Sequence, residues 1–292
     1  MFIIEYKGQK LINKVHPKAI VRQTIIEPET DSIGSSLKEL WTFRELLLIL
    51  SEREVSLRYR QTFLGVTWVV IQPLLTSVIF TIIFGKLMKA PSDNVAYEIF
   101  TFAGLLSWNL FSQSLQRAGI SLTKDIRLIT KIFFPRIIIP LASTLSTLID
   151  FAVSLIILFI LMPFYKTPFL LNLLIIPILL VFNVLLAAGV GIIFASLNVY
   201  YRDFTYVLPF VVQIWMYASP LAYSAKLIPQ NWSWVYNINP IVGIINGFRW
   251  AVFGNSAFPT SSLIYSAISS IVIFFVSLVI FNRLERSFAD VI

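Results

Sequence analysis

The sequence predicts an all-α, polytopic membrane protein, and three observations lead to this fold class. Hydrophobic residues make up 57% of the 292-residue chain and charged residues only 13%, with a mean hydropathy of +0.81. A soluble domain carries roughly 25% charged residues. The apolar residues also gather in runs of about 20, the length of a membrane-spanning helix. Finally, Lys and Arg are distributed unequally between the segments that separate these runs.

Six apolar runs are long enough to span a membrane. The predicted spans cover residues 63–84, 99–116, 137–162, 169–197, 206–223 and 263–281, within a transmembrane domain of residues 61–292. Between the last two spans, residues 230–254 hold two apolar pieces that are too short to span and are separated by Asn239-Pro240. We expect two short re-entrant or interfacial helices here.

The distribution of Lys and Arg predicts the orientation. Of the 23 such residues, 18 lie in residues 1–62, in the loops after the second and fourth predicted spans and in the C-terminal tail. Because cytoplasmic segments are enriched in Lys and Arg, both termini are expected in the cytoplasm and residues 230–254 face outward. The formal net charge of +8 is then typical of loops beside anionic lipid and does not indicate nucleic-acid binding.

The N-terminal part of the chain is predicted to lie outside the membrane. Residues 1–35 form a polar cytoplasmic segment, without a cleavable signal sequence. Residues 36–60 predict an amphipathic helix that begins with a capping box between Ser36 and Glu39. Its charge excludes a span, so we expect it at the cytoplasmic membrane surface or on a soluble partner domain, which are compatible locations. The apolar half comprises Leu37, Leu40, Trp41, Leu47, Leu48 and Val55.

Several classes of function lack the residues that they need. The chain has no Cys and one histidine, His16, which excludes thiolate chemistry and a His metal site. No GxxxxGK[ST], HExxH or GxSxG motif occurs. The sequence therefore predicts a protein that is not an enzyme, binds no cofactor and has no ATP site of its own.

Aromatic and amide side chains form a candidate substrate pathway. Tyr206, Phe210, Gln213 and Tyr217 recur on one helical face of the fifth predicted span. Aromatic faces stack on sugar rings and polar tips bind hydroxyls, which favours a long, hydroxyl-rich substrate over a small ion. Alternatively, Trp and Tyr near span ends form interfacial belts. Pairs one helical turn apart complete the predicted pathway: Trp68 with Gln72, and Trp108 with Ser112.

Asp150 is the one acidic residue centred in a predicted span. A carboxylate in hydrocarbon is costly, so it is expected to face the protein interior and to have a partner. It is either a substrate or proton site, or a buried group that forms a hydrogen bond to a neighbouring helix or is protonated. No obvious intramembrane cation is available in the sequence, which favours the second interpretation.

Five segments, in chain order, carry a family resemblance. They are FRELLLILSEREVSLRYRQTFLGVTWVVIQPLL, LITKIFFPRIIIPLAS, LNVYYRDFTYVLPF, ASPLAY and NPIVGIINGFRWAVFG. From about Leu37 onward, the chain resembles the ABC-2 type permeases that export polysaccharides such as O-antigen, capsule and teichoic acid. The direction of transport, out of the cytoplasm, rests on this resemblance alone.

The resemblance implies a homodimer in the bacterial inner membrane, with six spans per subunit. Each subunit would dock a separate cytosolic ATPase, which binds ATP and Mg, and the substrate would be an undecaprenyl-diphosphate-linked glycan. The residues that the resemblance implies for ATPase coupling are Arg53, Glu54, Arg117, Lys124, Asp125, Arg127 and Lys131. Those implied for an outward gate are Asn239, Pro240 and Arg249.

Two arginines precede the first predicted span. We hypothesise that Arg58 and Arg60 recruit the diphosphate headgroup of the substrate. The alternative is that they only anchor the span at the cytoplasmic surface. The competing functions are a passive channel, an ABC-2 permease for a small lipid or drug, and a membrane-bound glycosyltransferase, for which an acidic cluster is lacking.

Overall fold

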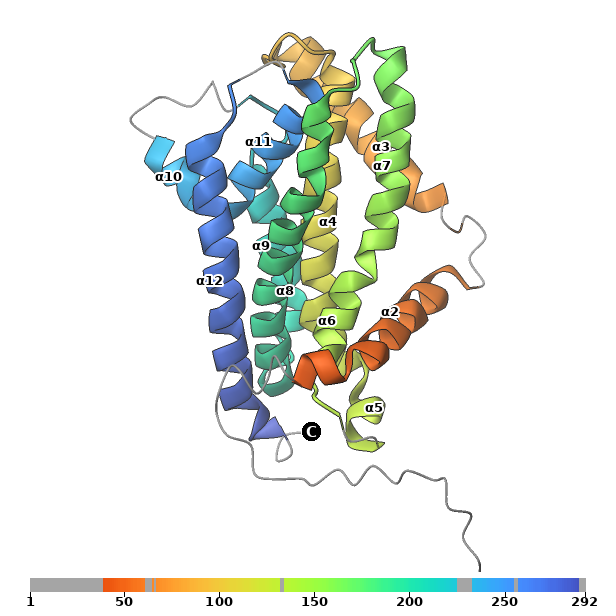
Figure 1. The fold of residues 1–292 in the computed structure, drawn as a ribbon, viewed down its shortest axis with the longest axis vertical. Helices are drawn as coiled ribbons and strands as arrows, with labels where there is room; N and C mark the ends of the chain where they lie inside the picture. The colour runs from red at the N-terminus through yellow and green to blue at the C-terminus, as the bar shows by residue number, and fades with distance from the viewer. Residues whose placement is uncertain are drawn as a thin grey trace, which may run out of the picture. The chain divides into compact units, whose positions relative to one another are not determined.

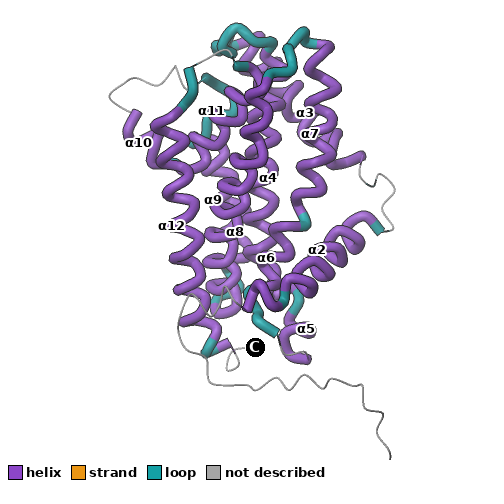
Figure 2. The backbone as a smooth tube through the Cα atoms, in the orientation of Figure 1, coloured by secondary structure: helices purple, strands orange, loops and turns teal. Residues whose placement is uncertain are grey.

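The computed structural model describes residues 39–60, 65, 67–131, 134–224, 233–254 and 257–288. Within these ranges all regular secondary structure is helical (Figure 2), which confirms the predicted all-α class. The predicted cytoplasmic segment 1–35 and the start of the capping box at Ser36 lie outside the described residues.

Figure 1 shows the arrangement of the helices. In chain order they are α2 (Arg44–Tyr59), α3 (Thr67–Phe80), the π-helix η1 (Thr81–Leu87), α4 (Tyr97–Lys124), α5 (Ile126–Lys131), α6 (Ile138–Leu145), α7 (Thr147–Phe164), the 3₁₀-helix η2 (Leu171–Ile175), α8 (Ile176–Tyr200), α9 (Phe204–Tyr217), α10 (Ser233–Ile238), α11 (Pro240–Phe253) and α12 (Thr260–Glu285).

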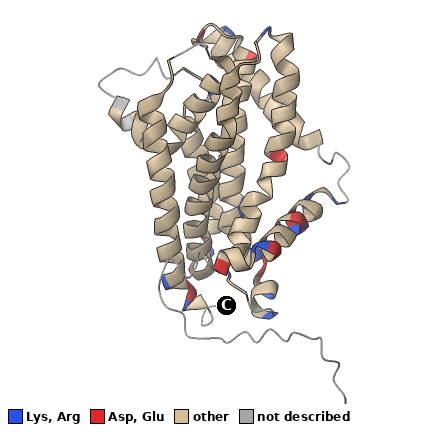
Figure 3. Ribbon diagram, in the orientation of Figure 1, with Lys and Arg blue, Asp and Glu red and all other residues tan. Residues whose placement is uncertain are grey.

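Among the described residues, four helical segments are long and apolar enough to cross a membrane. They are Thr67–Leu87, Ile138–Phe164, Leu171–Tyr200 and Thr260–Glu285, which overlap the first, third, fourth and sixth predicted spans. Charged residues gather on α2 and at helix ends, whereas α8 and α9 carry none along their length (Figure 3). Uncharged helices of this kind are suited to a hydrocarbon environment.

The second predicted span belongs to a longer and more polar helix. α4 has 28 residues and continues to Lys124, past the predicted end at residue 116. It carries Asn109 and Gln113 along its length and is not among the four strongly apolar segments. Most of its side chains are buried against α8, α6, α7, α11 and α3. Its polar groups therefore face protein, where hydrogen-bond partners are available, and not lipid.

The fifth predicted span was wrong at its C-terminal end. α9 has 14 residues and stops at Tyr217, and residues 218–224 form no helix. Pro220 cannot continue the helical hydrogen-bond ladder. The free carbonyl of Ala218 instead accepts a hydrogen bond from the Asn239 side chain at 3.3 Å. The end of α9 is thus set by a residue outside the predicted span.

α2 faces the protein with a narrower stripe than the predicted apolar half. Leu47 and Leu50 pack in a core cluster beside α6, which α2 crosses at the lower end in Figure 1. Trp41, which precedes α2, and Leu48, both predicted for the same side, are 71% and 63% exposed. Because a helix neighbour covers only part of the apolar half, α2 keeps a second apolar strip at its surface. This second strip fits a helix with one side on protein and the other in lipid.

The contact between α11 and α12 depends on a glycine. A Cβ added at Gly243 would overlap the backbone oxygen of Ser262 in α12. At Gly247, one turn further along α11, a Cβ would meet only side-chain ends, those of Leu179 at 3.1 Å and of Leu263 at 3.4 Å. Backbone cannot move aside as a side-chain end can, so α12 can approach α11 this closely only at a residue without a side chain.

We therefore expect Gly243→Ala to lower the free energy of unfolding by about 1–3 kcal/mol, the usual cost of overpacking. Gly247→Ala is the matched control and should have a much smaller effect. Thermal unfolding of the purified full-length chain in detergent measures both. Equal midpoints for the two variants would show that the contact at Gly243 does not hold α11 on α12.

Candidate functional site

A buried ionic cluster joins α2, α4 and α7. The Asp150 carboxylate, whose side chain is 6% exposed, accepts hydrogen bonds from Arg58 Nη1 and Tyr59 Oη. Arg117 Nη2 lies 3.4 Å from Asp150 Oδ2. These four residues are called the Asp150 cluster below. The expectation that Asp150 lacks a cationic partner was wrong, because α2 and the extended C-terminal part of α4 bring two arginines to it.

Further hydrogen bonds hold the two arginines in place. Arg58 Nη2 donates to Ser146 Oγ at 2.8 Å, and Arg117 Nη2 donates to Gln113 Oε1 at 3.2 Å. Burial, together with the hydrogen bond to Asp150, raises the pKa of Tyr59 to about 12. The Tyr59 hydroxyl is therefore protonated at neutral pH and acts as a donor to the carboxylate.

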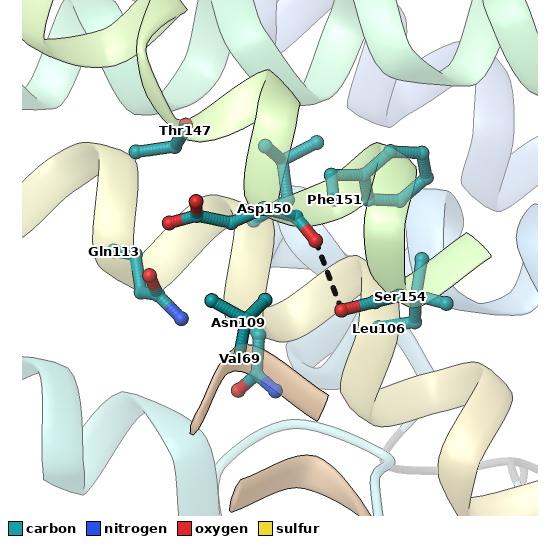
Figure 4. A pocket seen from close by; sticks show the side chains of 9 residues that line it. Val69, Leu106, Asn109, Gln113, Thr147, Asp150, Phe151 and Ser154 are labelled. Carbon is teal, nitrogen blue, oxygen red and sulfur yellow. Dashed lines mark hydrogen bonds between the residues drawn. The ribbon is translucent and has the colours of Figure 1, made fainter. Parts of the chain in front are cut away.

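The Asp150 cluster borders a cavity of about 310 Å³. A smaller pocket of about 10 Å³, with room for about one water molecule, continues from it between α3, α4 and α7. Figure 4 shows the side chains of Asp150, Gln113 and Asn109 around this smaller pocket. Within the described ranges, no three acidic, His or Cys side chains gather in a way that suits a metal ion. The larger cavity is lined by a set of residues that includes Arg58, Trp68, Gln72, Gln113, Arg117 and Asp150.

The structure separates the predicted pathway residues into three groups. On α3, Trp68 and Gln72 are exposed and line the larger cavity. On α9, the four predicted residues form one exposed face, with Tyr206 81% and Tyr217 68% exposed. The other members of this face are Phe210 and Gln213.

The third group lies inside the protein. Trp108 and Ser112 are buried, and the Trp108 ring packs 5.5 Å from the ring of Phe111. The structure thus does not bring these two α4 residues to the exposed faces of α3 and α9. Their helical spacing is the same as that of Trp68 and Gln72, and the sequence alone does not distinguish a buried face from an exposed one.

Residues predicted for ATPase coupling form two ion pairs with each other. Arg53 Nη2 lies 2.9 Å from Asp125 Oδ1, and Lys124 Nζ lies 3.3 Å from Glu54 Oε2. Adjacent residues of α2 therefore bind adjacent residues at the end of α4, which ties the two segments together. Of the remaining predicted residues, Arg117 belongs to the Asp150 cluster, and Arg127 and Lys131 are exposed on α5.

The residues predicted for an outward gate hold residues 218–224 in place. Arg249 is 7% exposed and donates to the carbonyl oxygens of Pro220 at 2.6 Å and Leu221 at 2.8 Å. Its guanidinium lies 3.7 Å from the centre of the Phe100 ring in α4. No carboxylate among the described residues forms an ion pair with Arg249, and main-chain oxygens and an aromatic face satisfy its guanidinium instead.

Asn239 connects the same segment to α9. Its Oδ1 accepts from Trp215 Nε1 at 2.8 Å and from the backbone N–H of Ile241 at 3.3 Å, which caps α11. Pro240 occupies the first turn of α11, where its missing N–H is not needed.

Sequence reasoning missed several residues of these sites. Gln113 lies four residues before Arg117, and Ser146 four residues before Asp150. This spacing places each pair on one helical face and was a readable signal. Tyr59 and Trp215 offered no comparable signal, because their partners lie on other helices.

The chain is similar to known membrane-transport proteins. A family model described as "ABC-2 type transporter" matches residues 45–253. The chain is 29% identical over 249 residues to the O-antigen export system permease protein RfbA of Klebsiella pneumoniae, covering 85% of this chain and 95% of that protein. It is 27% identical to RfbA of Myxococcus xanthus, covering 87% and 98%. It is 24% identical to the polysialic acid transport protein KpsM of Escherichia coli, covering 80% and 92%.

We expect the Asp150 cluster to stabilise the folded protein. Asp150→Ala leaves two half-buried arginines without their shared anion, so we expect the free energy of unfolding to fall by about 2–4 kcal/mol. Asp125→Ala, which removes an acid paired with the exposed Arg53, should cost about 1 kcal/mol or less. Denaturation of the detergent-solubilised chain compares the two variants. A cost for Asp150→Ala no larger than that for Asp125→Ala would contradict the importance of the cluster.

Proposed function

Because the chain belongs to the ABC-2 type transporter family, we propose that it is the permease subunit of an ATP-driven exporter of polysaccharide. The observation that carries this proposal is the similarity to polysaccharide export permeases over most of both chains. The exposed aromatic and amide face of α9 supports it physically, since such side chains bind sugar rings and hydroxyls without strict selectivity.

Energy for export would come from a separate cytosolic ATPase that binds ATP and Mg. The absence of a phosphate-binding loop in the sequence supports a separate energy source. The docking surface would comprise α2, the end of α4 and α5. This assignment is supported by the two ion pairs between α2 and α4, which make these segments one unit, and by the exposed Arg127 and Lys131 beside them.

A homodimer with six spans per subunit is the proposed assembly. The spans would be α3 with η1, α4, α6 with α7, η2 with α8, α9 and α12, in the bacterial inner membrane with both termini cytoplasmic. A path between two copies would be lined by side chains that are exposed in one copy, which favours α9 and α3 and not the buried Trp108 and Ser112. α10 and α11 would lie on the outward side, where Asn239 and Arg249 hold residues 218–224.

The proposed substrate is a glycan on an undecaprenyl diphosphate carrier. Export is tested by reconstituting the permease with its ATPase in vesicles and measuring transfer of a lipid-linked glycan across the bilayer. We expect transfer to require hydrolysable ATP and the ATPase. Transfer at full rate by the permease alone would refute the exporter and favour a passive channel.

The same assay tests whether the exposed face of α9 lines the substrate path. The double variant Gln213→Ala with Tyr217→Ala should slow export several-fold while the ATPase still binds, because two sugar-contacting groups are lost. Ile214→Ala removes a neighbouring exposed aliphatic side chain and should leave export unchanged. If the Ile214 variant slows export as much as the double variant, the face does not line the path.

The pairing of α2 with α4 is tested by reversing charges. Arg53→Glu places a carboxylate beside Asp125 and should uncouple ATP hydrolysis from export, with a small change in stability because the pair is partly exposed. Adding Asp125→Arg restores an opposite-charge pair and should recover export. The ratio of glycan transferred to ATP hydrolysed measures the coupling, and an uncoupled double variant would argue against this role.

A further inference from the structure

The cavity beside the Asp150 cluster has an excess of positive charge. Two guanidinium groups, of Arg58 and Arg117, line it together with one carboxylate, that of Asp150. Arginine stays protonated throughout the accessible pH range. The described walls of the cavity therefore carry one more positive than negative charge. A cleft with an excess of one sign of charge attracts ions of the opposite sign, here an anion.

Arg58 and Arg117 differ in their hydrogen bonds to protein groups and in their exposure. Arg58 donates to both Asp150 and Ser146, and its side chain is 16% exposed. Arg117 is 3.4 Å from Asp150, beyond the usual 2.7–3.2 Å for N–H···O bonds, and its side chain is 29% exposed. Because a guanidinium has five N–H donors, Arg117 retains donors that can reach a ligand in the cavity.

We propose that this cavity binds a phosphate or diphosphate group, with Arg117 and Arg58 as its charged donors. A planar guanidinium matches the oxygens of a phosphate group in a bidentate manner. The volume of about 310 Å³ lies at the lower end of the roughly 300–1,000 Å³ typical of ligand pockets. Arg60, which was hypothesised to share this role, is exposed and does not line the cavity.

The surface beside the cavity favours a lipid-linked source of this group. Trp68 and Gln72 at the cavity are followed at helical spacing by Leu75 and Ile79, which are 54% and 52% exposed. α3 thus offers an apolar strip that begins at the cationic cavity. A prenyl chain on this strip would place its diphosphate between the arginines. The lipid-linked form of the proposal rests on the proposed function, whereas the anion site does not.

Asp150 would compete with the ligand for the same guanidinium groups. Replacing its charge by a neutral amide in Asp150→Asn removes this competition and should tighten binding several-fold. Arg117→Gln removes the available donor and should weaken binding about tenfold or more. The two variants change binding in opposite directions, which a general loss of folding cannot produce.

The test uses the full-length chain in nanodiscs and isothermal titration calorimetry with three probes. We expect farnesyl diphosphate to bind more tightly than inorganic pyrophosphate, and farnesol to bind weakly. Arg283→Gln is the matched control, because it removes an exposed arginine of α12 far from the lining residues in sequence. It should bind farnesyl diphosphate as the unchanged chain does.

A labelling experiment gives an independent measurement. The chain has no Cys, so Gln72→Cys introduces a single reactive thiol at the cavity, and Ser56→Cys introduces one on the exposed side of α2. Farnesyl diphosphate should protect the thiol at position 72 from a water-soluble maleimide and leave that at position 56 reactive.

The outcomes separate the anion site from its source and from export. Wild-type affinity in Arg117→Gln, an equal loss in Arg283→Gln, or unprotected labelling at position 72 would overturn the site. Equal binding of pyrophosphate and farnesyl diphosphate would support the anion site and overturn its lipid-linked form. Diphosphate binding that is lost in Arg117→Gln, in a chain that shows no ATP-dependent export, would support the site and refute the proposed function.

Discussion

The need to neutralise one buried carboxylate constrains much of this structure. Asp150 lies in an apolar helix, where an unpaired charge is prohibitively costly. Its partners come from α2 and α4, so both helices must reach α7 at the same level. The contact ties the C-terminal end of α2 to α4 and α7. It also places two arginines beside one acid, which creates the cationic cavity described above.

Arg249 shows the same physical requirement met in a different way. It is buried and forms no ion pair with a carboxylate in the described part of the chain, and the carbonyl oxygens of Pro220 and Leu221 and the ring of Phe100 satisfy it. Phe100 lies near one end of α4 and Arg117 toward the other. At a rise of 1.5 Å per residue, the two residues are about 25 Å apart along the helix axis. The buried Arg249 at one end and the half-buried Arg117 at the other therefore join α4 to other segments.

α4 connects several segments of the protein, a role that its composition does not predict. It is the most buried of the long helices and the one whose polar side chains meet partners from several neighbours. α2 is attached to its C-terminal end by two surface ion pairs and by the Asp150 cluster. A rigid helix that contacts both α2 and residues 218–224 provides a direct physical connection between them, and packed interiors transmit such displacements.

The sequence by itself determined the class of the protein, most of its helices and its family resemblance, because composition and helical periodicity are local properties. It also identified Asp150 as an unusual residue, and the family resemblance pointed to Asn239 and Arg249. Only the tertiary structure decided that Asp150 is paired, since Arg58 and Arg117 lie 92 and 33 residues away from it in the chain. In the same way, only contacts between helices decided where α9 ends and which strip of α2 faces the protein. They also decided that Trp108 and Ser112 are buried whereas Trp68 and Gln72 are exposed. The physical reason is that the spacing of residues determines which side chains share one face of a helix. Whether that face contacts protein or stays exposed depends on the neighbouring helices.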